Sequence, residues 1–254
     1  MVVLQAEDIV KVYDGERGGC STKALNRISF EIEKGEFVGI MGPSGSGKTT
    51  LLNLLSGIDN PTAGYVKISG KKINEMDKAE LAIFRRQHLG FVFQEFNLLD
   101  SLSLKENVML PMILDKKSPE HMENRVREVM STFDIYNISN KYPYNISGGQ
   151  QQRVAVSRAL VNEPSIIFAD EPTGNLDSKS SKGIMKCFEK MNIELENTIL
   201  VVTHDVFAAS YCNRVIFIKD GMLNSQIIKK GTREEFLEQI MNSLAILGGD
   251  RNDL

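Results

Sequence analysis

The chain has 254 residues, of which 42% are hydrophobic and 25% are charged, values typical of a globular protein with a substantial core. Its formal net charge of −3 does not favour nucleic acid as the main partner. The three cysteines, Cys20, Cys187 and Cys212, are too widely spaced to indicate a metal site or a disulfide framework. They fit a reducing cytosol.

The N-terminal stretch is not typical of a secretion signal, because Glu7 and Asp8 interrupt its apolar residues. No apolar run in the sequence reaches the roughly 18 residues that a membrane-spanning helix needs. We therefore expect any role at a membrane to depend on a partner protein.

The first part of the chain predicts strands. Apolar residues recur through 2–12, which predicts a strand that ends at Tyr13, and a polar, glycine-rich loop follows over 14–22. Residues 24–32 alternate again, and so do residues 65–68 further along the chain, before a glycine turn. Together these stretches predict an antiparallel β layer with a hairpin at its edge.

Between these strands lies a stretch with the pattern of a phosphate-binding loop. An apolar run at 37–41 predicts a buried strand, and residues 49–55 predict a helix. The segment between them matches G-x-x-x-x-G-K-[ST], in which backbone N–H groups surround nucleotide phosphates. Lys48 would add a positive charge at the β- and γ-phosphates, and the Thr49 hydroxyl would ligate Mg²⁺. The alternative, a flexible Gly/Ser turn, leaves the flanking strand and helix unexplained. The predicted loop consists of Gly42, Pro43, Ser44, Gly45, Ser46, Gly47, Lys48, Thr49 and Thr50.

The middle of the chain predicts helices. A capping-box pattern at 77–80 predicts a helix to about Gln87, followed by a core strand at 89–93 that ends at Gln94. From 96 to 162 no stretch has the pattern of a strand. This segment contains a second capping box at 103–106, in a helix that we expect Pro111 to disturb, and a third helix that starts at 118–120 with proline at its first position.

After this helical segment the α/β pattern returns. Short apolar runs predict strands, amphipathic stretches predict helices, and Asp220-Gly221 predicts a hairpin turn. The expected strands cover 165–169, 198–203 and 214–218, and the expected helices cover 178–192, 205–212 and 234–247.

A second glycine motif narrows the choice among phosphate-loop proteins. In the segment 145–153, Ser147 is placed as an N-cap, Gly148 and Gly149 allow close backbone approach, and a helix is expected from Gln150. This is a second helix N-terminus suited to an anion. A single nucleotide does not need both of these helix N-termini from the same molecule.

The segment 145–153 resembles the signature motif of the ATP-binding-cassette (ABC) superfamily, and Asp170 and Glu171 follow at the family's spacing. The resemblance covers nearly the whole chain. It implies an α/β fold, the P-loop NTPase fold of ABC ATPases, with a RecA-like core, an antiparallel β subdomain and a helical subdomain insert. The chain would be a single domain, 1–254. Its expected parts are the core at 1–95 and 163–231, the helical insert at 96–162, and a C-terminal helix at 232–254.

The resemblance also implies catalytic roles. Glu171 matches the general base that orients the attacking water, and His204 matches the histidine that contacts the γ-phosphate. Asp170 matches the carboxylate that holds Mg²⁺, together with Thr49. Gln94 matches the glutamine that ligates the metal and reports nucleotide state to the membrane partner. Outside this family, these residues would be interpreted as a solvated acid, a capping histidine and a loop glutamine.

Further positions match residues of the family that bind ATP. Tyr13 matches the aromatic residue that stacks on adenine, and Asp177 lies in the loop that couples the two sites of a dimer. In the family, two subunits pair head to tail around two ATP molecules. Each signature motif then closes over the partner's γ-phosphate. The matching residues here are Ser147, Gly148, Gly149 and Gln150.

Finer similarity points to the branch that contains macrolide and lipoprotein-releasing exporters, on residues 93–99 and 106–108. Within it, residues 97–102, 208–212 and 214–221 look most like the bacitracin-type peptide-resistance and sensing exporters. The expected partners are a second copy of the chain, a membrane permease that docks near Gln94 and 96–104, and, through the permease, a histidine kinase. The expected location is the cytoplasm, peripheral on the inner face of the cell membrane.

Other functions stay open at this point. A macrolide or lipoprotein exporter, and a regulatory ATPase that signals without transport, would carry the same motifs. Soluble ABC ATPases that act on DNA or the ribosome usually have a long coiled coil or tandem cassettes, and this chain has neither. A P-loop kinase leaves 147–150 unexplained. Two departures from the family pattern are the long polar loop at 14–22 and Ile146, where leucine is more common.

Overall fold

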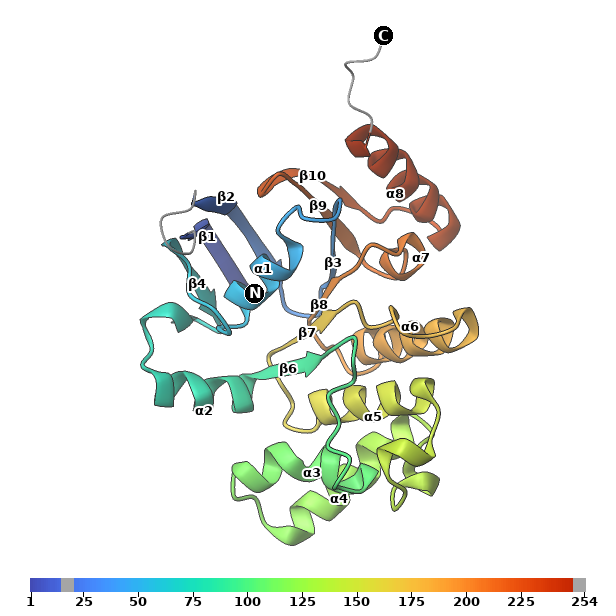
Figure 1. The fold of residues 1–254 in the computed structure, drawn as a ribbon. Helices are drawn as coiled ribbons and strands as arrows, with labels where there is room; N and C mark the ends of the chain where they lie inside the picture. The colour runs from blue at the N-terminus through green and yellow to red at the C-terminus, as the bar shows by residue number, and fades with distance from the viewer. Residues whose placement is uncertain (15–20, 249–254) are drawn as a thin grey trace. The chain divides into compact units, whose positions relative to one another are not determined.

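The structure is a computed structural model that describes residues 1–14 and 21–248. The chain divides into two compact units. The first contains Met1–Asp77 and Leu200–Leu254, and the second contains Lys78–Ile199. Figure 1 shows the helices and strands of both units.

The first unit contains an antiparallel sheet. Its strands are β1 (Val2–Tyr13), β2 (Thr22–Glu33), β4 (Ala63–Ile68) and the short β5 (Lys71–Lys72), in the order β2-β1-β4-β5. The predicted β layer and its edge hairpin are therefore confirmed. Most of the polar loop expected at 14–22, together with Cys20, lies outside the described residues.

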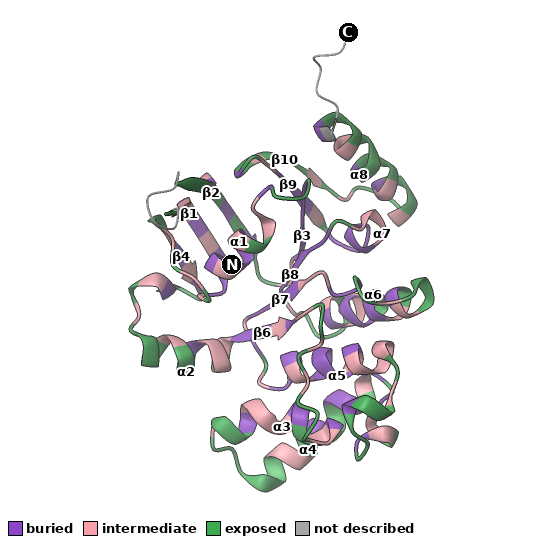
Figure 2. Ribbon diagram, viewed as in Figure 1, coloured by how far each residue is buried: buried purple, intermediate pink, exposed green. Residues whose placement is uncertain are grey.

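The same unit contains the strand that leads into the phosphate loop. This strand, β3 (Phe37–Met41), is buried along its whole length (Figure 2) and pairs in parallel with β9 (Arg214–Lys219). An antiparallel hairpin joins β9 to β10 (Met222–Ile228). Asp220 and Gly221 form its turn with φ angles of 51° and 71°, both in the left-handed region that a type I′ turn requires. The predicted hairpin turn is confirmed.

Helices α1 (Lys48–Leu55), α7 (Val206–Ala209) and α8 (Arg233–Gly248) complete the first unit, with a 3₁₀ turn at Ile73–Glu75. The C-terminal helix α8 packs on this unit, as predicted. Its side chains Phe236 and Ile240 are fully buried. Its first residue, Arg233, places its guanidinium 4.6 Å from the ring centre of Tyr211, a cation–π contact.

The second unit combines two parallel strands with helices. Strand β6 (Leu89–Val92) pairs with β7 (Ile166–Asp170), with Val92 opposite Ala169. Helix α2 (Lys78–His88) precedes β6, and α6 (Ser178–Ile193) follows β7. Because paired parallel strands end at the same edge, the residues that follow β6 and β7 lie close together.

Between β6 and β7 the chain is helical, and residues 96–162 contain no strand, as predicted. The helices α3 (Leu104–Leu114), α4 (Pro119–Thr132) and α5 (Gly148–Leu160) pack against one another (Figure 1), with 3₁₀ turns at Tyr136–Ile138 and Pro143–Asn145. Ser103 and Glu106 form the predicted capping box of α3, and Ser118 caps α4.

The expectation that Pro111 disturbs α3 needs correction, since the helix continues through it to Leu114. Proline removes only one donor from the helix, the N–H that would reach the carbonyl of Asn107. The last turn is still closed by a bond from the Asp115 N–H to the Pro111 carbonyl, at 3.2 Å.

Among the residues that the structure describes, Cys187 and Cys212 are free and buried, one in each unit. Burial raises the pKa of Cys187 to about 11 and raises the pKa of Cys212 as well, so both thiols are unreactive at neutral pH. None of the helices in the described part of the chain has the length and apolarity to cross a membrane.

Candidate functional site

The residues singled out from the sequence fall into two sets, one in each unit. The first unit holds Tyr13, the phosphate loop 42–50 and His204. The second unit holds Gln94, the signature segment 147–150, Asp170, Glu171 and Asp177.

The phosphate loop has backbone angles that only glycine adopts readily. Gly45 and Gly47 have φ angles of 76° and 98°. A Cβ atom on Gly47 would also lie 2.7 Å from the side chain of Leu25. Gly47 is the N-cap of α1 and provides no side-chain cap. The first N–H groups of α1 therefore have no side-chain acceptor at the cap and can bind an anion.

The side chain of Lys48 folds back over its own loop. Its Nζ donates to the carbonyl of Gly42 at 2.9 Å and to that of Pro43 at 2.8 Å. The Ser46 side chain is only 4% exposed, and its Oγ has no hydrogen-bond partner within the described residues. A positive charge held over left-handed glycines and a helix N-terminus is the donor set that nucleotide phosphates need, so the loop fits ATP.

Tyr13 lies at the end of β1 and is 42% exposed. Its hydroxyl donates to Asp59 at 3.0 Å, and the ammonium of Lys11 lies 4.9 Å from its ring centre. The same Lys11 forms a 2.7 Å ion pair with Asp59. These contacts fix the orientation of an exposed aromatic ring, as a stacking platform requires.

His204 follows β8 (Ile199–Val202) and is exposed. The residue before it, Thr203, donates its N–H to the carbonyl of Ile40 in β3 at 3.1 Å. Asp205 then caps α7 by accepting the N–H of Phe207 at 2.8 Å. The hydrogen bond to β3 places the histidine turn beside the strand that leads into the phosphate loop.

In the second unit, the ends of β6 and β7 bring three predicted residues together. Gln94 lies shortly after β6, and Asp170 and Glu171 lie at the end of β7. Glu171 has a φ of 43°, an unusual angle for a residue other than glycine. A turn follows, closed by a 3.0 Å bond from the Gly174 N–H to the Glu171 carbonyl.

Two reciprocal hydrogen bonds join Gln94 to this turn. The Gln94 amide donates to Asn175 Oδ1, and the Asn175 amide donates to the Gln94 backbone carbonyl, both at 3.2 Å. A Cβ atom on Gly174 would lie 2.8 Å from the Gln94 amide nitrogen, so a larger residue here would displace the Gln94 side chain from this position. The turn after Gln94 and the turn after Glu171 therefore form one connected structure.

The signature segment starts α5 as expected. Ser147 Oγ accepts the N–H of Gln150, and the Gln150 side chain accepts the N–H of Ser147, which completes a capping box. A Cβ atom on Gly149 would lie 3.0 Å from the Oγ of Ser180. This glycine therefore lets the start of α5 pack closely on the start of α6.

Asp177 is the N-cap of α6. It accepts hydrogen bonds from the hydroxyl and the N–H of Ser180 and from the N–H of Lys179. These bonds, first of all the one from the Ser180 hydroxyl, hold the pKa of Asp177 below its usual value, so the carboxylate is ionised at neutral pH.

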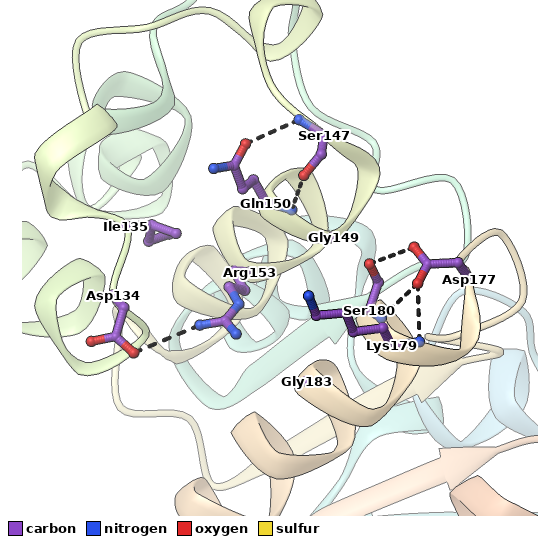
Figure 3. Close-up of a pocket in the computed structure, with 10 residues that line it drawn as sticks. All are labelled: Asp134, Ile135, Ser147, Gly149, Gln150, Arg153, Asp177, Lys179, Ser180 and Gly183. Carbon is purple, nitrogen blue, oxygen red and sulfur yellow. Dashed lines mark hydrogen bonds and ion pairs between the residues drawn. The ribbon is translucent and has the colours of Figure 1, made fainter.

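A pocket of about 550 Å³ lies between the starts of these two helices, within the second unit (Figure 3). Arg153 and Lys179 contribute two cations to its lining, and the guanidinium of Arg153 lies 3.8 Å from Asp134. The two cations are balanced by the carboxylates of Asp134 and Asp177, and Asp177 itself caps α6, so the start of α5 is the part of this lining that suits an anion. The pocket is lined by Asp134, Ile135, Ser147, Gly149, Gln150, Arg153, Asp177, Lys179, Ser180 and Gly183.

The predicted metal ligands were Thr49, Gln94 and Asp170. In the described part of the chain, no group of three or more histidine, cysteine, aspartate or glutamate side chains is arranged to hold a metal. Mg²⁺ at a nucleotide takes six oxygen ligands, among them one or two carboxylates, phosphate oxygens and water. A hydroxyl, an amide oxygen and one carboxylate are therefore a suitable donor set for Mg²⁺ bound to ATP.

Gln152 lies within the segment 145–153, but its sequence context predicted no role for it. This residue of α5 is fully buried and contacts the turns at both Gln94 and Glu171. The available signal was its position on the apolar face of α5, shared with Ala155, Val156 and Ala159. A glutamine at such a position needs buried hydrogen-bond partners.

The known proteins that this chain resembles are described as belonging to ABC transporters. A family model described as "ABC transporter" matches residues 25–174. The chain is 48% identical over 254 residues to the bacitracin export ATP-binding protein BceA of Halalkalibacterium halodurans, and the match covers both proteins completely. It is 50% identical over 252 residues to the ABC transporter ATP-binding protein YxdL of Bacillus subtilis, which covers 99% of this chain and 97% of YxdL.

Among solved structures, the chain resembles the ATP-binding cassette MJ0796 of Methanocaldococcus jannaschii. The match has a TM-score of 0.81 and 42% identity, and covers 90% of this chain and 100% of the other. That structure is described as dimeric, in a post-hydrolysis state bound to ADP and Pi.

Proposed function

Because this chain belongs to the ABC transporter family as its ATP-binding, ATP-hydrolysing subunit, we propose that two copies close around two ATP molecules and drive a membrane permease. The observation that carries this proposal is the pair of anion-binding helix starts, α1 and α5, which lie in different units of one chain. In a head-to-tail dimer, the phosphate loop of one subunit and the signature segment of the other would hold the same ATP.

Within each site, we assign the phosphate loop 42–50 to the triphosphate and Tyr13 to the adenine. Lys48 would exchange its bonds to loop carbonyls for bonds to phosphate oxygens, which are stronger because both partners are charged. Thr49, Gln94 and Asp170 would hold Mg²⁺, whose chemistry is to neutralise charge on the phosphates.

Glu171 is assigned as the general base for the attacking water, and His204 as a contact to the γ-phosphate. The signature residues would complete the partner's site, and Asp177 would couple the two sites. We also keep the predicted division into a core at 1–95 and 163–231, a helical insert at 96–162 and a C-terminal part from 232, of which residues 249–254 lie outside the described residues.

The permease contact is proposed at a cavity of about 500 Å³ within the second unit, among α2, β6, α3 and α5. Its apolar lining includes Phe93 and Leu114, and Leu114 is 56% exposed. Arg85 and Arg158 also line it, and burial lowers the pKa of both guanidiniums. A permease segment with apolar side chains and a carboxylate would cover the exposed leucine and pair with these partly buried charges.

Leu114→Asp tests this contact. We expect at least about tenfold less co-purification of the permease, because a carboxylate replaces an apolar contact, with basal ATPase activity unchanged. Ile113→Asp is the matched control, since Ile113 is the preceding residue of α3, is 46% exposed and does not line the cavity. Equal co-purification of both variants would contradict the proposed docking surface. Leu99→Asp tests the neighbouring predicted segment, in which Leu99 is 47% exposed.

For the physiological role, we propose export linked to resistance against, and sensing of, peptide antibiotics that target the cell envelope. Support comes from the full-length similarity to a bacitracin export protein. On this proposal the subunit is cytoplasmic and peripheral on the inner face of the membrane. A histidine kinase would be reached through the permease, and no nucleic acid is involved. The choice of peptide lies with the permease.

A strain that carries only Glu171→Gln is expected to become sensitive to such peptides and to stop inducing any linked resistance operon. The reason is that both responses need ATP turnover if peptide flux is the signal. The measurement is growth and operon expression across a panel of bacitracin-type and lantibiotic-type peptides. Wild-type resistance in this strain would remove the peptide role and favour the macrolide or lipoprotein exporters. Lost resistance with intact induction would instead favour a regulatory ATPase.

A further inference from the structure

We propose that Gln152 is a positioning residue that fixes the Gln94 turn against the Glu171 turn through one side-chain amide. This inference rests on the proposed function, in which Glu171 orients the attacking water and Gln94 ligates the metal. Gln152 contacts neither nucleotide nor metal on this proposal. It acts by setting the relative position of the two residues that do.

The geometry of Gln152 is specific to these two turns. Its Nε2 donates to the carbonyl of Phe93 at 3.1 Å and to the carbonyl of Pro172 at 2.6 Å. Phe93 directly precedes Gln94, and Pro172 directly follows Glu171. The two N–H groups of one amide thus hold the backbone next to each candidate catalytic residue.

Burial of this amide costs free energy, which indicates that the two hydrogen bonds it donates are needed. The Gln152 side chain is fully buried, and its Oε1 has no hydrogen-bond partner within the described residues. A buried polar atom without a partner is destabilising, and a methionine of similar size would avoid it. Rotating the amide by 180° would place the oxygen against two carbonyls, so the donors must face the turns.

The backbone at Glu171, beside the carbonyl that Gln152 binds, has a locally unfavourable conformation. Glu171 has a φ of 43°, and it precedes Pro172, although residues before proline favour extended backbone. Such a conformation persists only where the surroundings fix it. The reciprocal bonds between Gln94 and Asn175 add a second connection between the same two turns.

Gln152 also links these turns to the signature segment, because it lies in α5 only five residues after Ser147. A helix start that closes on a partner's ATP would therefore move the amide that holds both turns. We infer that this amide aligns Gln94 and Glu171 when the signature segment is engaged, which makes hydrolysis depend on dimer closure.

The test compares Gln152→Met with Gln151→Met in the full-length chain. Gln151 is the matched control because it lies in the same helix and also donates its Nε2 to a carbonyl, that of Pro143, at 3.0 Å. Gln152→Met should lower kcat at least tenfold while the ATP dissociation constant changes less than twofold. Gln151→Met should leave both within twofold. Equal kcat values for the two variants would overturn the proposal.

A second measurement separates positioning from general damage. In the Glu171→Gln background, adding Gln152→Met should cause a much smaller further loss of rate than in wild type, because one of the two residues being positioned no longer acts as a base. A further loss by the same factor as in wild type would assign Gln152 a purely structural role. If Glu171→Gln alone keeps the wild-type rate, the base assignment fails, and that failure is distinct from a failure of Gln152.

Gln152→Glu provides a further test that does not require the methionine variant to fold. A buried carboxyl group has a raised pKa, and its protonated form can donate one hydrogen bond where the ionised form can donate none. The rate relative to wild type should therefore fall as the pH rises from about 6 to about 9. A ratio that is independent of pH would contradict the role of the donated bonds.

Discussion

Replacement of Glu171 by glutamine is expected to lower ATP turnover at least about 100-fold, the contribution typical of a positioned general base. The amide has nearly the shape of the carboxylate, but it cannot accept the proton of the attacking water. Binding of ATP should persist, because the triphosphate is assigned to the loop 42–50 and to α1. Single-turnover hydrolysis and nucleotide binding, measured side by side, separate the two effects.

The control for this prediction is Glu163→Gln. Glu163 also lies in the second unit, shortly before β7, and its side chain is 76% exposed. Its replacement should leave turnover within about twofold, because an exposed ion pair contributes little. Turnover of Glu171→Gln at the control's rate would contradict the assignment of the base.

The second large effect tests whether each ATP site takes its phosphate loop from one subunit and its signature segment from the other. Lys48→Ala removes the charge at the phosphates and should weaken ATP binding roughly tenfold to one-hundredfold. Ser147→Arg removes the N-cap of α5 and places a bulky cation at the signature segment. Each variant alone should be nearly inactive, since every site in its homodimer lacks one half.

Mixing the two variants should restore activity. Heterodimers would contain one site with both halves intact, so an equal mixture is expected to reach about one quarter of wild-type turnover if the two sites act independently. Subunit exchange is verified with two distinguishable tags. A mixture that forms heterodimers but stays as inactive as its components would contradict the head-to-tail arrangement, or would require both sites to act together.

Much of the fold could be predicted because local patterns and tertiary structure agree. The alternation of apolar residues predicted β1 and β2, and the Asp-Gly pair predicted the turn of the β9–β10 hairpin. The capping box at Ser103 predicted the start of α3. The relatives confirm the predicted ABC ATPase fold. Pro111 was the exception, since helix packing outweighed the loss of one backbone hydrogen bond.

The candidate site was predictable where a motif has one local geometry. Both motifs start helices close to the expected positions: α1 begins at Lys48, one residue before the predicted start, and α5 begins at Gly148, two residues before it. The contacts of Gln152 and Asn175 could not be predicted, because they depend on which carbonyls the packing of α5 and the turns brings within reach. A hydrogen bond between residues 59 positions apart leaves no local pattern.

The solution mass of the Glu171→Gln variant tests the nucleotide-closed dimer most directly. One chain has a mass of 28.4 kDa. In ATP and Mg²⁺, multi-angle light scattering should show twice that mass, with two ATP bound per dimer, because hydrolysis can no longer open the closed state. Without nucleotide, or with Ser147→Arg added, the mass should return to that of a single chain. A variant that binds ATP fully and yet stays at the mass of one chain would contradict the nucleotide-closed dimer.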